Sequence, residues 1–145
     1  MSKDFLSKEE LHEISSCISL AELNSSAEIR VHIENKCAKE PLTRAKEVFT
    51  NLKMNKTKDR NGVLLYIAHQ DKKFAIFGDQ GIHEKLGDQF WQEEKDLLKS
   101  YFSQSQFKEG INQAINKVAE KLTLYFPRQS NDSNELSNEV SIENN

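Results

Sequence analysis

The sequence predicts an α/β fold, a three-layer α/β/α sandwich built on a small mixed β-sheet. Residues 27–34 alternate between apolar and polar side chains, and residues 62–68 are continuously apolar. Both patterns are typical of strands. Between them, Pro41 begins a segment with the apolar spacing of a helix. A strand, a helix and a strand in this order imply two parallel strands joined by a right-handed crossover.

The first two elements follow from local patterns. Ser7 and Glu10 form a capping box that begins a helix of about four turns. The strand that follows has one apolar face, made of Ala27, Ile29, Val31 and Ile33, and one polar face, made of Glu28, Arg30, His32 and Glu34.

The remaining elements complete the sheet and its covering helices. The strand at 62–68 lacks polar alternation, so we expect it to be central and covered on both faces. A tight turn at 69–72 leads to a third strand at 73–77, which is therefore antiparallel to the second. After a short helical turn around His83, helices are expected at about 88–102 and 106–125, and Pro127 ends the last one.

The 145 residues divide into one folded unit and a tail. Residues 1–126 have enough apolar side chains for one core and form a single domain. Residues 127–145 contribute three apolar side chains, Leu136, Val140 and Ile142. Such a segment buries too little apolar area to offset the entropy of ordering, so we expect a disordered polar tail.

Composition excludes several classes of protein. The formal net charge of −3 equals the charge of the predicted tail alone, so the folded part is close to neutral and is not expected to bind nucleic acid. No apolar run is long enough for a membrane span, and the first residues do not resemble a secretory signal. Two cysteines match no disulfide framework or metal spacing. We expect a cytoplasmic monomer whose protein partner the sequence does not identify.

Common catalytic signatures are absent, but the expected topology brings three carboxylates together. The hairpin pairs Asp79 with Gly62 at the end remote from its turn. Glu28 begins the parallel neighbouring strand, and Asp59 lies in the loop before Gly62. We therefore predict that Glu28, Asp59 and Asp79 converge and bind a divalent cation, calcium with magnesium as the alternative.

The competing interpretation is that these acids only cap helices and occupy solvated loops. Arg30 has the same ambiguity, because it could bind a phosphate or pair with the acids on its own strand. Six side chains near the predicted cation are candidates to support its ligands or to contact a substrate: Arg30, Arg60, Asn61, Gln80, Glu84 and Asp88.

A series of motifs in order resembles the TPM-domain family. The segments that carry this resemblance are 26–33, Pro41 with 45–49, 58–68, 77–82, Gly87-Asp88 and Phe90-Trp91. The family's Asp-Asn-Gly pattern matches 59–62 with one inserted residue, and its glycine-flanked loop matches 78–81. Many members have Gly-Tyr-Gly in that loop, where this chain has Asp79-Gln80.

The resemblance implies an α/β/α sandwich, divalent-cation binding with calcium, and the acid phosphatase activity attributed to some plant members. Two functions are therefore expected as alternatives. The first is a calcium-binding interaction or regulatory module. The second is a metal-assisted phosphatase acting on phosphomonoesters, whose catalytic residues the sequence does not identify. We favour the first because phosphatases usually add a nucleophile or several cationic groups.

Overall fold

A computed structural model describes residues 5–128 and 138–145 of the chain. Its elements follow in the order α1 (Lys8–Ala21), β1 (Glu28–Glu34), α2 (Pro41–Asn51), η1 (Met54–Lys56), β2 (Gly62–Ala68), β3 (Lys73–Gly78), α3 (Gln80–Phe102), α4 (Phe107–Tyr125) and β4 (Ser141–Glu143). Among the described residues, no helix is long and apolar enough to cross a membrane.

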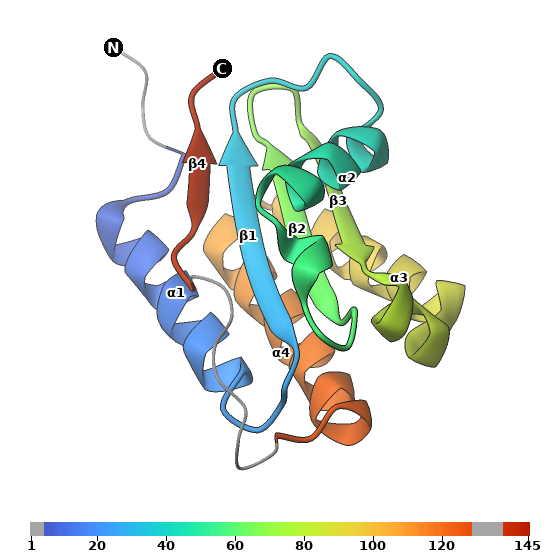
Figure 1. The fold of residues 1–145 in the computed structure, drawn as a ribbon. Coiled ribbons are helices and arrows are strands. Elements are labelled where there is room, and N and C mark those ends of the chain that lie inside the picture. Colours follow the sequence, from blue (N-terminus) through green and yellow to red (C-terminus); the bar gives the residue numbers. More distant parts are fainter. Residues whose placement is uncertain (1–4, 129–137) are drawn as a thin grey trace.

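The four strands form one mixed sheet in the order β3-β2-β1-β4 (Figure 1). Strands β1 and β2 are parallel, as are β1 and β4, whereas β2 and β3 are antiparallel. The predicted α/β class and the mixed sheet are confirmed. The crossover through α2 makes the first two strands parallel, and the four-residue turn after Ala68 reverses the third.

Helices cover both faces of the sheet and create two cores. In Figure 1, α2 lies in front of the sheet, and α1, α3 and α4 lie behind it. The core behind the sheet contains the apolar face of β1 together with Ile14 and Ile18 of α1 and Ile111 and Leu122 of α4. The core in front is smaller and packs α2 against Leu64 and Tyr66 of β2.

Strand β2 occupies the centre of the sheet, and all seven of its residues are buried. Val63, Leu65 and Ile67 face the larger core. This confirms the central position predicted from the absence of polar alternation. Strand β1 is buried on its polar face as well, where Glu28, His32 and Glu34 are each no more than 3% exposed.

Local signals begin and interrupt the helices as predicted. Ser7 and Glu10 form the reciprocal hydrogen bonds of a capping box at α1. Pro41 occupies the first turn of α2. Gly87, with φ of 79°, interrupts α3, which separates the short turn around His83 from the long helix that follows. Left-handed backbone favours glycine because a Cβ would crowd the chain there.

The C-terminal segment differs from the sequence-based expectation. We expect a disordered tail at 127–145, but Ser141–Glu143 forms β4 and pairs with His32–Glu34 of β1. Residues 129–137 of that tail lie outside the described residues. The strand forms because β1 offers it an open edge and polar partners, neither of which a local pattern reveals.

Candidate functional site

The residues predicted to bind a cation lie near the amino ends of β1 and β2. Glu28 is the register partner of Gly62 across the parallel pair. On the other side, Val63 pairs with Gly78, and the Asp79 amide donates to the Gly62 carbonyl at 2.9 Å. Asp79 and Glu28 therefore flank Gly62 from two neighbouring strands, as the predicted hairpin register requires.

Asp79 is buried and already has a cationic partner. It is the N-cap of α3, where its carboxylate accepts a hydrogen bond from the Gln80 amide at 2.8 Å. The same carboxylate accepts two bonds from Arg60, at 2.7 Å from Nε and 3.0 Å from Nη2. The Arg60 side chain is 51% exposed, so this guanidinium supplies a positive charge from the solvent side.

Backbone oxygens of the preceding loop lie against the start of α3. The Gly81 amide donates to the Arg60 carbonyl at 2.8 Å. A Cβ on Gly81 would lie only 2.2 Å from the Asp59 carbonyl oxygen and 2.7 Å from that of Arg60. Gly81 is therefore needed for the close approach of this loop to α3, which places two loop carbonyl oxygens against the first turn of the helix.

Glu28 is buried beside a second carboxyl group. Burial, together with the adjacent Glu28, raises the pKa of Glu22 to about 8. The hydrogen bond that Glu22 Oε2 accepts from the Ile29 amide at 2.7 Å acts in the opposite direction and lowers the pKa, but by less. Two neighbouring carboxyl groups in a buried site cannot both ionise readily. Burial and the neighbouring Glu28 therefore both favour the protonated form of Glu22.

The other predicted residues occupy more varied positions. Asp59, Glu84 and Asp88 are exposed. Buried Asn61 donates to the Ser26 hydroxyl at 3.3 Å and so joins the loop to the segment that precedes β1. Gln80 Nε2 donates to the Glu84 carboxylate at 3.3 Å, and the Asp88 carboxylate lies 3.3 Å from His83 Nε2. Arg30 Nε is buried without a hydrogen-bond partner among the described residues.

The structure brings Asp79, Arg60 and Gln80 into direct contact, but it does not gather all three predicted ligands. Within residues 5–128 and 138–145, one group of three acidic or ligating side chains has its ligand atoms within 4.8 Å of one another, and it is His32, Glu34 and Glu143. That group lies at the opposite end of β1 from Glu28. A cation that used Glu28, Asp59 and Asp79 would therefore require loop rearrangement.

Sequence reasoning missed the polar cluster around Glu34. This fully buried carboxylate accepts hydrogen bonds from Arg44 at 2.9 and 2.8 Å and from the Tyr66 hydroxyl, and lies 3.1 Å from His32 Nε2. Burial alone would raise the pKa of Glu34, but these hydrogen bonds outweigh it and lower the pKa to about 2. The one sequence signal was that His32 and Glu34 share a strand face, since Arg44 and Tyr66 are distant in sequence.

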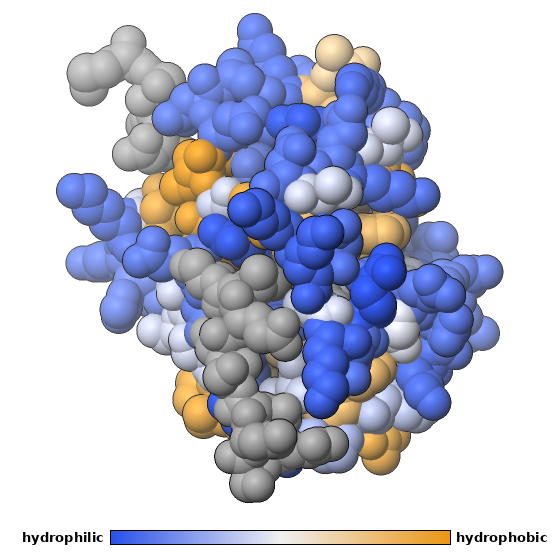
Figure 2. Space-filling view, viewed as in Figure 1, coloured by the Kyte–Doolittle hydropathy of each residue, from blue (hydrophilic) through white to orange (hydrophobic). Residues whose placement is uncertain are grey.

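Strand β4 completes this cluster from the other side. His32 Nδ1 lies 2.9 Å from the Ser141 hydroxyl, and Arg44 bonds Glu143 at 2.9 Å. The guanidinium of Arg44 thus links α2, β1 and β4. Figure 2 shows that the face presented in Figure 1 is mainly hydrophilic, with exposed hydrophobic residues confined to small separate patches.

The family comparison agrees with the motifs and the fold. The model of the TPM domain matches residues 2–121, and the chain therefore belongs to the TPM-domain family. A search of curated proteins found no match.

Solved structures share the fold. The NMR structure of the BA42 protein from the psychrophilic bacterium Bizionia argentinensis is 41% identical, with a TM-score of 0.91 and 99% coverage of both chains. The N-terminal domain of cg2496 from Corynebacterium glutamicum is 13% identical, with a TM-score of 0.64 over 81% of this chain and 74% of that one. An N-terminal domain from P. gingivalis is 17% identical, with a TM-score of 0.68 over 86% and 82%. The last two support the fold alone.

Proposed function

We propose that this TPM domain binds a divalent cation, calcium in preference to magnesium, at the amino ends of β1 and β2. In this proposal the bound cation orders the 55–61 loop and the 78–84 segment, in which α3 begins, and these then contact a protein partner. The observation that carries it is the buried Asp79 carboxylate, whose countercharge comes from the half-exposed Arg60, while the Asp59 and Arg60 carbonyl oxygens lie against Gly81 two residues further on.

The pairing with Arg60 supports exchange for a cation. Asp79 is buried, so its negative charge requires a positive partner in any state of the protein. The Arg60 side chain is 51% exposed, so it can move into water once a cation takes its place beside Asp79. Arg60 also has φ of 50°, in a loop with an unusual backbone. A divalent cation would replace one positive charge with two and relieve repulsion among nearby acids.

The oxygen donors available fit calcium better than magnesium. Asp79 and Glu28 would supply carboxylates from ordered segments, Asp59 would supply one from the exposed loop, and loop carbonyls and water would complete the shell. Calcium accepts six to eight oxygens in flexible geometry, whereas magnesium requires a near-ideal octahedron. Irregular loops satisfy the first requirement more easily.

A hollow beside the site supports its use as a contact surface. It has a volume of about 510 Å³ and includes Asp79, Gln80, His83, Trp91 and Phe77. Trp91 Nε1 is buried there without a hydrogen-bond partner among the described side chains and backbone. Ordering of the adjacent loop would change the shape of this hollow, which gives the cation a means to regulate a partner.

A calcium titration followed residue by residue by NMR tests the proposal. With calcium up to about 10 mM, resonances of 55–61 and 78–84 should shift, and magnesium should act more weakly. Asp79→Asn and Asp59→Asn should each raise the dissociation constant for calcium by about tenfold. Asp96→Asn, at an exposed position, should leave it unchanged. Unshifted loops, or equal binding by all variants, would contradict it.

The phosphatase alternative makes a separate prediction. It requires hydrolysis of a phosphomonoester that depends on the cation and is lost in Asp59→Ala. Cation binding without hydrolysis would support the calcium-binding interaction module and contradict the phosphatase. In the metal-free fold, Arg60 is engaged by Asp79, so it is not free to hold a phosphate.

A further inference from the structure

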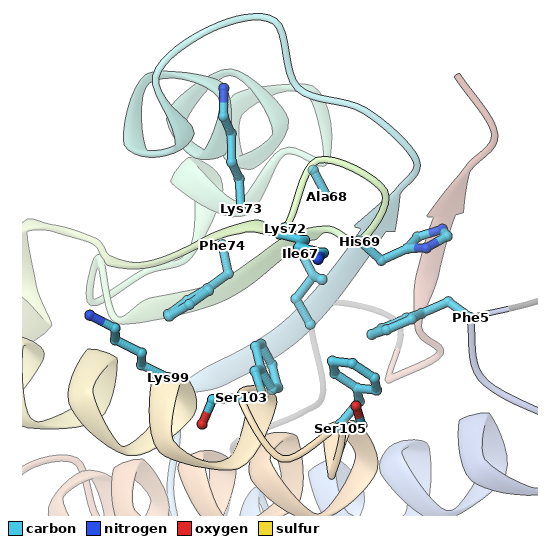
Figure 3. A pocket seen from close by; sticks show the side chains of 12 residues that line it. Phe5, Ile67, Ala68, His69, Lys72, Lys73, Phe74, Lys99, Ser103 and Ser105 are labelled. Carbon is cyan, nitrogen blue, oxygen red and sulfur yellow. The ribbon is translucent and has the colours of Figure 1, made fainter.

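A second cavity lies at the other end of the sheet from Asp79. It has a volume of about 470 Å³ and is enclosed by Phe5, the β2–β3 turn, the end of α3 and the start of α4 (Figure 3). This volume is typical of sites for small organic molecules.

Aromatic rings form the apolar wall of this cavity. Phe74 and Phe102 meet edge to face with centroids 5.2 Å apart, and Phe102 and Phe107 are 5.4 Å apart. Phe5 contacts Phe107 with centroids 4.7 Å apart and stacks on His69 at 4.7 Å, so the row of rings continues to the β2–β3 turn. Such an arrangement presents both ring faces and ring edges, which is the environment that another aromatic ring prefers.

The rim of the cavity is cationic although the whole chain has a net charge of −3. Three lysines and no acidic residue line it. Lys73 extends toward α2 in Figure 3, where its ammonium donates to the Cys37 carbonyl at 3.0 Å. Lys72 and Lys99 are exposed, and neither has an ion pair or a side-chain hydrogen bond to another described residue. Two positive charges therefore remain available at the mouth.

His69 contributes a polar edge without a further charge. Burial lowers the pKa of His69, so the ring is neutral near pH 7. Its Nε2 lies 2.8 Å from Asn35 Oδ1, which fixes the orientation of the ring against Phe5. The hydroxyls of Ser103 and Ser105 also line the cavity and can form hydrogen bonds with a polar group.

We propose that this cavity binds a small aromatic anion, with its ring against Phe74, Phe102 and Phe107 and its acidic group between Lys72 and Lys99. The charge of the rim selects an anion, and the aromatic wall selects a ring rather than a free inorganic ion. The acidic group can be a carboxylate or a phosphate, since both accept hydrogen bonds from ammonium groups. The site is independent of calcium because it lies at the opposite end of β2 from Gly62.

An NMR titration with three probes tests this assignment. The probes are 2-naphthoate, its neutral analogue 2-naphthamide and inorganic phosphate alone. Naphthoate at millimolar concentration should shift resonances of 67–74 and 99–107 saturably. The amide should bind at least about fivefold more weakly, and phosphate should produce no saturable shift. Naphthyl phosphate then shows whether the site prefers the carboxylate or the phosphate as its acidic group.

Paired variants separate this site from surface charge in general. Lys72→Gln with Lys99→Gln should weaken naphthoate binding at least about fivefold and leave the weak amide binding unchanged. Lys85→Gln with Lys121→Gln removes the same charge from exposed positions outside the cavity and should change neither. Equal binding of naphthoate and the amide, equal loss in both double variants, or shifts elsewhere in the domain would overturn the proposal.

Discussion

Glu34 and Asp79 are both buried carboxylates at the sheet, and each accepts two hydrogen bonds from an arginine, but their surroundings differ. Glu34 lies at the carboxyl end of β1, where Arg44 is only 21% exposed and where Tyr66 and His32 provide further contacts. Asp79 lies at the other end, where Arg60 is 51% exposed and belongs to a loop. A carboxylate–arginine pair is thus found at each end of the sheet, and its arginine is mostly buried at the enclosed Glu34 end and half-exposed at the Asp79 end.

This difference indicates separate roles for the two ends. A buried pair is strongly destabilised when one partner is lost, because the other remains uncompensated. In the Asp79 pair the arginine is half-exposed, so Arg60 can move into water when another cation takes its place. The Glu34 cluster therefore holds α2, β1 and β4 together, whereas the Asp79 pair can exchange its arginine for another cation.

The largest expected effect tests the enclosed end. Glu34→Gln leaves the Arg44 guanidinium without its buried counterion, and we expect it to lower the free energy of unfolding by about 3 to 5 kcal/mol. The comparison variant is Asp79→Asn, which keeps an N-cap residue and frees a half-exposed arginine, with an expected loss below about 1 kcal/mol. Urea denaturation measures both, and equal losses would contradict the contrast.

The pH dependence of stability should also differ between the ends. In the folded protein the pKa of Glu34 is lowered to about 2. Its contribution to the free energy of unfolding is therefore fully present above pH 4.5 and is lost as the pH falls toward 2. The pKa of Glu22 is raised to about 8. Between pH 4.5 and 8 the folded state then holds a proton that the unfolded state has released, so stability falls as the pH rises.

Glu22→Gln should reduce the decrease in stability that occurs between pH 4.5 and 8. Burial also raises the pKa of Glu94 to about 8, so two groups contribute over the same range. From pH 5 to pH 8 we expect the variant to lose roughly 2 to 3 kcal/mol less stability than the wild type. Denaturation curves at four pH values measure this, with exposed Glu120→Gln as the control. Parallel stability profiles for Glu22→Gln and the wild type would show that Glu22 ionises normally.

The smallest effect concerns the strand that completes the enclosed end. Deletion of residues 138–145 removes β4, its pairing with β1 and the Glu143 contact to Arg44. We expect a loss of about 1 to 2 kcal/mol, because most of the side-chain hydrogen bonds of this segment are exposed to water and Ile142 is half-exposed. Glu143→Gln removes the ion pair alone and should cost below about 1 kcal/mol. An unchanged denaturation midpoint after the deletion would show that β4 adds no stability.

Most of the fold was predictable because its signals are local. The capping box at Ser7, the helical spacing after Pro41 and the unbroken apolar strand around Leu65 each depend on neighbours in sequence. The hairpin register followed from turn length and placed Asp79 next to Gly62. The candidate site was predictable to the same extent, as the meeting of two loops at one end of the sheet.

The sequence by itself therefore determined the helices, the three main strands and the loops that approach each other. Only the tertiary structure decided which charges pair: Arg60 binds Asp79, and Arg44, rather than Arg30, binds Glu34. It also decided that Ser141–Glu143 becomes a strand. The physical reason is that periodicity is a property of adjacent residues, whereas buried charge pairing and edge-strand pairing depend on partners that folding brings from far along the chain.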